Sequence, residues 1–97
     1  MNEGISDALP STSEISEALH ATAVEYGGLG WAVDEQVAVA RRLRAVTVES
    51  QRNKAKMTTA KEIREAFAAF ALKPPPRGYA SRVVARLHRL YDRLAAR

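Results

Sequence analysis

Cysteine is absent from the sequence, which excludes disulfide frameworks, thiolate zinc sites and cysteine nucleophiles. Aromatic residues make up only 6% of the chain, and the five glycines and four prolines are too few for a fibrous or disordered protein. No apolar run approaches the roughly 20 residues of a transmembrane helix. Acidic Glu3 and Asp7 stand where a signal peptide would be basic. We therefore expect a folded, soluble protein of the cytoplasm.

The residues that are abundant favour helices. The chain has 97 residues, the length of one domain, and 46% of them are hydrophobic. Alanine, leucine, arginine and glutamate dominate, and these residues lose little side-chain freedom on entering a helix. No alternation typical of strands extends over a useful length. The composition predicts an all-α fold, a small domain of three to four helices.

Caps and chain breaks divide the sequence. Ser11 and Thr59 are each followed three residues later by glutamate, the capping-box pattern of a helix start, and Asp34 is expected to cap another helix. Gly27–Gly30 and Pro74–Pro76 interrupt helices. The expected division is an N-terminal arm over residues 1–10 and a single helical domain over 11–97, with an acidic helix at about 12–26 and basic helices at about 34–56, 59–72 and 79–96.

The charge of the chain is split along its length. The net charge is +4, but residues 1–35 contain seven of the eleven acidic residues and no lysine or arginine. All fifteen basic residues lie in residues 36–97. A basic segment of this kind is typical of a surface that binds a polyanion.

The positive charge of the expected last helix is concentrated in one stripe. At 100° per residue, five arginines lie within about 80° of one another: Arg82, Arg86, Arg89, Arg93 and Arg97. Apolar residues occupy a separate face: Ala80, Val83, Val84, Leu87, Leu90, Tyr91 and Leu94. Like charges four residues apart destabilise a helix, so an anionic partner would relieve the repulsion. Arginine also offers a planar fork of donors suited to phosphate or carboxylate.

Four interpretations of this arginine stripe stay open. It can bind nucleic acid, with DNA favoured, or an acidic surface of a protein. It can also be a solvated face whose last arginines complement the negative end of the helix dipole. In the fourth interpretation the acidic helix at about 12–26 lies against the basic helices, within one chain or between two copies. A chain this short often completes its core by dimerising, so we also consider a homodimer.

The third and fourth expected helices resemble a helix-turn-helix unit in shape. On that interpretation Tyr79, Ser81, Arg82 and Arg86 lie near the start of the recognition helix, Tyr79 at an exposed helix entry, while Arg77 meets phosphate. The connector from Lys73 to Gly78 contains three prolines and is longer than the usual turn of roughly three or four residues. The resemblance is therefore to a shape and assigns no residue roles.

Nothing in the sequence indicates catalysis. His20 and His88 are not placed in a metal-binding pair. Gly27–Gly30 lacks the Lys-Ser/Thr of a phosphate loop and follows a helix instead of a strand. The hydroxyl residues stand where helix caps belong. We expect no enzyme activity, no cofactor and no metal.

The sequence thus predicts a non-enzymatic nucleic-acid-binding protein, a small regulator that uses its arginine-lined C-terminal helix. The alternative is a small adaptor or inhibitor whose arginine face binds an acidic protein in a nucleic-acid-processing complex. No membrane partner is expected. The residues expected to contact the partner are Arg52, Lys54, Lys56, Arg77, Tyr79, Ser81, Arg82, Arg86, Arg89, Arg93 and Arg97.

Overall fold

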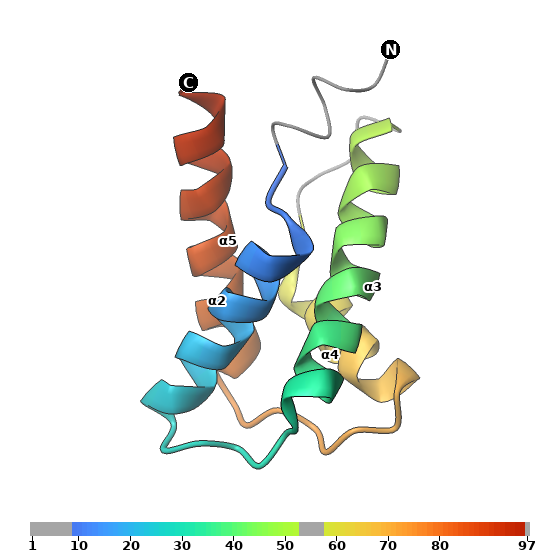
Figure 1. Ribbon diagram of the computed structural model, residues 1–97, viewed down its shortest axis with the longest axis vertical. Helices are drawn as coiled ribbons and strands as arrows, with labels where there is room; N and C mark the ends of the chain where they lie inside the picture. Colours follow the sequence, from blue (N-terminus) through green and yellow to red (C-terminus); the bar gives the residue numbers. More distant parts are fainter. Residues whose placement is uncertain (1–8, 53–57, 97) are drawn as a thin grey trace.

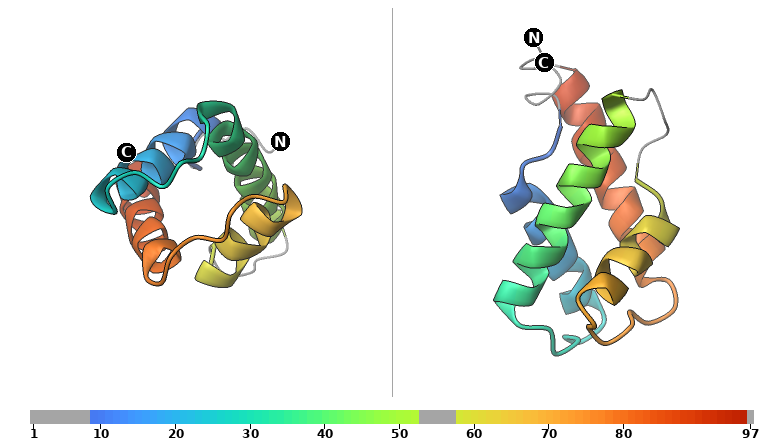
Figure 2. Two further views of the ribbon diagram at one scale, coloured as in Figure 1. Left: turned by 90° about the horizontal axis from the view of Figure 1, so that it is seen from below. Right: turned by 90° about the vertical axis from the view of Figure 1, so that its right-hand side faces the viewer.

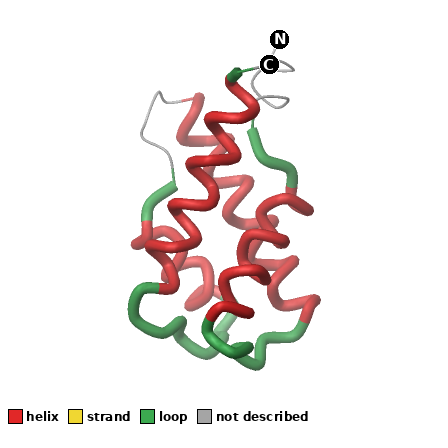
Figure 3. The backbone as a smooth tube through the Cα atoms, turned by 90° about the vertical axis from the view of Figure 1, so that its left-hand side faces the viewer, coloured by secondary structure: helices red, strands yellow, loops and turns green. Residues whose placement is uncertain are grey.

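The predicted all-α class is confirmed by the computed structural model, which describes residues 9–52 and 58–96. Within these residues the chain forms four helices and no strand. The helices are α2 (Thr12–Glu25), α3 (Val33–Arg52), α4 (Ala60–Ala69) and α5 (Tyr79–Ala95). Figure 3 shows the loop that joins α2 to α3 and the loop that joins α4 to α5.

The four helices surround a shared core. Seen along the bundle in Figure 2, α2 lies between α3 and α5, α4 lies on the other side between the same two helices, and α3 and α5 are diagonal to each other. α2 runs antiparallel to α5, and the loops over residues 26–32 and 70–78 meet at the same end of the bundle (Figure 1). This arrangement places the C-terminal end of α2 beside the first turns of α5.

Both predicted capping boxes are present. The backbone N–H of Glu14 donates to Ser11 Oγ at 3.1 Å, and the N–H of Ser11 donates back to Glu14 Oε1 at 2.9 Å. Thr59 and Glu62 form the same pair of bonds at the start of α4. Each box satisfies two donors that the first turn of a helix would otherwise leave unbonded.

The start of α3 differs from the prediction. The helix begins at Val33, and Asp34 lies in its first turn. The residue before it, Ala32, donates its N–H to Glu35 Oε1 at 2.7 Å, so the reaching carboxylate replaces the expected cap. An acidic residue in the first turn still complements the positive end of the helix dipole. The predicted end near residue 56 lies outside the described residues.

α2 and α4 end in the same motif with different residues. In α2 the N–H of Gly28 donates to Ala23 O, and Gly27 has φ 82°. In α4 the N–H of Leu72 donates to Phe67 O, and Ala71 takes the left-handed position with φ 55°. This is the Schellman pattern, for which glycine is the preferred residue. It ends α4 at Ala69 instead of near the expected Leu72.

The core takes side chains from every helix. Buried residues include Ile15 and Leu19 on α2, Val39 and Leu43 on α3, Ile63 and Phe67 on α4, and Val83 and Leu87 on α5. Full burial of such side chains contributes about 1.5–3 kcal/mol each before conformational entropy is counted. Leu9 is buried although it lies within the predicted N-terminal arm, and the large apolar side chain of Phe70 is 44% exposed.

An aromatic cluster closes the end of the bundle where the loops meet, and Tyr79 is at its centre. Its ring centroid lies 5.1 Å from that of Trp31 and 5.8 Å from that of Phe67. Its side chain is 0% exposed, and its hydroxyl donates to Leu19 O at 3.0 Å. The prediction that Tyr79 is exposed to a partner is therefore wrong, because its hydroxyl finds a buried acceptor and the ring can pack. Burial raises the pKa of this phenol well above its ordinary value of 10.0.

Candidate functional site

The arginine stripe lies on the outer side of α5. Arg82, Arg89 and Arg93 are exposed, and the side chain of Arg86 is 31% exposed. The opposite side of the helix packs into the core through Val83, Leu87 and Tyr91, among others. The helix therefore docks by one face and presents the arginines on the other, as its 3.6-residue periodicity predicts.

Glu25, the last residue of α2, engages the first half of this stripe. Its Oε1 lies 3.6 Å from Nη1 of Arg82, and its Oε2 forms an ion pair and hydrogen bond with Nη2 of Arg86. The carboxylate is 40% exposed, so solvent weakens both pairs. Among the described residues, neither Arg89 nor Arg93 forms an ion pair with a carboxylate. The stripe is thus divided into an occupied half and an unoccupied half.

Tyr26 also contacts the N-terminal end of α5 and the loop before it. The guanidinium carbon of Arg82 lies 5.6 Å from the centroid of the Tyr26 ring, within range of a cation–π interaction. The Tyr26 hydroxyl donates to the backbone oxygen of Arg77 at 3.3 Å. Glu25 and Tyr26 together orient the Arg82 side chain, and Tyr26 also ties α2 to the loop that precedes α5.

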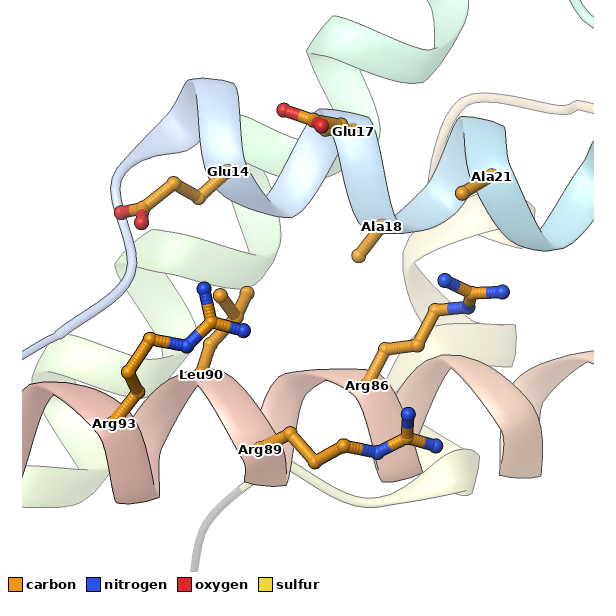
Figure 4. Close-up of a pocket in the computed structure, with 8 residues that line it drawn as sticks. All are labelled: Glu14, Glu17, Ala18, Ala21, Arg86, Arg89, Leu90 and Arg93. Atoms are coloured by element: carbon orange, nitrogen blue, oxygen red, sulfur yellow. The ribbon is translucent and has the colours of Figure 1, made fainter.

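A shallow groove runs between α2 and α5 beyond this contact. Its volume is about 270 Å³. Figure 4 shows arginines along the α5 side, carboxylates on the α2 side, and small apolar side chains between them. The lining residues are Glu14, Glu17, Ala18, Ala21, Arg86, Arg89, Leu90 and Arg93. The groove therefore offers both signs of charge across an apolar floor.

The remaining predicted contact residues are dispersed. Arg77 and Ser81 are exposed near the start of α5. Arg52 ends α3, while the predicted sites Lys54, Lys56 and Arg97 lie outside the described residues. The connector between α4 and α5 spans residues 70–78, longer than a helix-turn-helix turn of roughly three or four residues, and does not confirm that resemblance.

The contact of Glu25 with Arg82 and Arg86 agrees with the fourth interpretation of the stripe, in which the acidic helix lies against the basic helices, whereas Tyr26 was not predicted to belong to this site. A signal for Glu25 is present in the spacing, because Glu14 and Glu25 lie 11 residues apart and hence only about 20° apart around a helix. α2 therefore carries an acidic stripe that faces the arginines of α5. The contact of Tyr26 with Arg82 has no local signal, since it depends on how the two helices meet.

Neither a metal-binding group of side chains nor a membrane-spanning helix is found among the described residues. Within residues 9–52 and 58–96, no group of three or more histidine, aspartate or glutamate side chains could hold a metal ion. None of the helices in this part of the chain combines the length and apolarity needed to cross a membrane. Comparison of the chain with protein-family models, with curated proteins and with solved structures finds no match.

Proposed function

We propose that this protein is a non-enzymatic nucleic-acid-binding protein whose contact surface is the outer side of α5. The observation that carries the proposal is the pair Arg89 and Arg93, which are exposed, adjacent on the helix and without an ion pair among the described residues. A regulatory function through DNA binding is the setting we favour.

Distance and chemistry support a phosphate ligand. Arg82 and Arg93 are 11 residues apart, so the stripe extends over about 16 Å at 1.5 Å per residue. Several phosphates of one strand or duplex fit within that length, and guanidinium groups bind phosphate with two parallel hydrogen bonds. Contacts of this kind position a protein on nucleic acid without reading its sequence.

A second candidate is supported by the groove between α2 and α5. Ala18, Ala21 and Leu90 give it an apolar floor, and carboxylates of α2 line the side opposite the arginines. A polyanion would be repelled by those carboxylates, whereas a protein segment with both acidic and basic side chains would be complementary to the groove. This arrangement favours the adaptor or inhibitor, with acidic residues of the partner facing the arginines of α5 and basic residues of the partner facing α2.

Fluorescence anisotropy with a labelled 20-base-pair DNA duplex tests the first proposal. Four or five phosphate contacts predict a slope of log K against log salt of roughly −4. In the double variant Arg89→Gln and Arg93→Gln the slope should become shallower by about 2, with affinity reduced at least about 10-fold at low salt.

The matched control is the double variant Arg41→Gln and Arg42→Gln. It removes the same charge from exposed residues of α3, which lies diagonally across the bundle from α5 (Figure 2). Its slope should stay within about 0.5 of the wild-type value, because neither residue belongs to the proposed contact surface. Equal losses in the two double variants would show that total charge, and not the α5 surface, determines binding. Absence of binding to duplex and single-stranded probes at low salt would refute the proposal.

A further inference from the structure

Glu25 occupies the position that an anionic ligand would take at the start of the arginine stripe. One carboxylate oxygen faces Arg82 at 3.6 Å, and the other is bonded to Arg86. Two guanidinium groups converging on one anionic group is also how arginines bind a phosphate. Arg82 and Arg86 are thus already arranged around an anion supplied by the protein itself.

The stability of α2 does not explain a glutamate at this position. Glu25 is the final residue of the helix, where the backbone carbonyls create negative potential, and the last turn contains no basic residue. An acidic side chain is disfavoured there by the helix dipole. The favourable interactions of Glu25 therefore come from α5.

The contact of Glu25 with Arg82 and Arg86 can separate at low cost, because its side chains are partly exposed to solvent. The Glu25 carboxylate is 40% exposed and the Arg82 side chain 63%, so water can solvate both after separation. Arg82 retains the Tyr26 ring as a support when the carboxylate leaves, because the cation–π contact is independent of it. Opening would therefore expose two oriented arginines next to Arg89 and Arg93.

We infer that Glu25 is an intramolecular competitor of the polyanion, which restrains binding by occupying Arg82 and Arg86 until phosphates displace it. The inference rests on the proposed function of the arginine stripe. Arg89 and Arg93 make the first contacts with phosphates. Neighbouring phosphates then replace the Glu25 carboxylate at Arg82 and Arg86.

The test measures binding of the labelled 20-base-pair duplex to the full chain carrying Glu25→Gln. Because an exposed ion pair contributes up to about 1 kcal/mol, its loss should raise affinity about 3- to 5-fold. Glu65→Gln is the matched control, since it makes the same charge change at an exposed residue of α4, outside the groove and without an ion pair to an arginine of α5. Its affinity should change less than about 2-fold. Circular dichroism establishes that both variants are folded.

A third variant isolates the arginines as the route of the effect. In a background with Arg82→Gln and Arg86→Gln, adding Glu25→Gln should change affinity less than about 2-fold, because Glu25 then has no arginine with which to form an ion pair. Equal effects of Glu25→Gln and Glu65→Gln, or an effect of Glu25→Gln that persists without the two arginines, would overturn the inference while leaving the proposed function intact. If neither the wild type nor any variant binds, the proposed function itself fails.

Discussion

Replacing Tyr79 by phenylalanine should separate the buried hydrogen bond of this residue from the packing of its ring. The side chain is 0% exposed, and its hydroxyl donates to Leu19 O at 3.0 Å. Tyr79→Phe keeps the contacts with Trp31 and Phe67 but removes that bond. A buried hydrogen bond contributes about 1 kcal/mol net, so the free energy of unfolding at pH 7 should fall by about that amount. For a chain of this size the melting temperature should fall by about 4–8 °C.

The same substitution should change the response to alkaline pH. Burial raises the pKa of the Tyr79 phenol in the folded state above its ordinary value of 10.0. Above that pH the unfolded chain loses the proton while the folded chain keeps it, so stability falls as pH rises. The free energy of unfolding contributed by Tyr79 is therefore fully present below about pH 10 and decreases above it by up to about 1.4 kcal/mol per pH unit. Wild type and Tyr79→Phe should become equally stable between about pH 10.5 and 11.

Urea unfolding followed by circular dichroism from pH 7 to 11 measures both effects. Thr22→Val is the control, because the buried Thr22 hydroxyl donates to Ala18 O at 2.8 Å and is not a titratable group. Its difference from wild type should stay constant with pH to within about 0.5 kcal/mol. If wild type and Tyr79→Phe lose stability in parallel between pH 9 and 11, the reasoning from the buried phenol is refuted.

Three further predictions concern folding and are measured by the same urea titrations at pH 7. Ala71→Gly should raise the free energy of unfolding by about 0.5–1 kcal/mol, because Ala71 has φ 55° in a position that suits glycine. Gly27→Ala should lower the free energy of unfolding by a similar amount, because Gly27 has φ 82°. Changes of the opposite sign would contradict the assigned helix ends. Gly78→Ala should destabilise by about 1–3 kcal/mol, since φ is +89° and the added Cβ would lie 2.9 Å from the Tyr26 hydroxyl, and an unchanged midpoint would refute this close approach. Phe67→Ala should cost about 3–5 kcal/mol by leaving a cavity beside Trp31, whereas a loss under about 1 kcal/mol would mean that the aromatic cluster is not packed as described.

Much of the helical framework was predictable because it depends on residues close in sequence. The capping boxes at Ser11 and Thr59 bond residues three apart, and the structure contains both. The apolar face predicted for the last helix follows from the helical period alone, and its members Val83, Leu87 and Tyr91 are buried. The cap predicted at Asp34 was wrong because the helix begins earlier, at Val33, with the N–H of Ala32 donating to Glu35, and the residue types alone do not decide between the two starts.

The arginine stripe of α5 was likewise contained in the sequence, since spacing on one helix determines which side chains share a face. Tertiary structure alone decided which arginines are occupied and which are not. Glu25 meets Arg86, 61 residues along the chain, only because α2 packs antiparallel to α5. Tyr79 is buried for the same kind of reason, since its acceptor at Leu19 lies 60 residues away. Periodicity orients a side chain around its own helix axis, but the packing of the helices sets what that side chain meets.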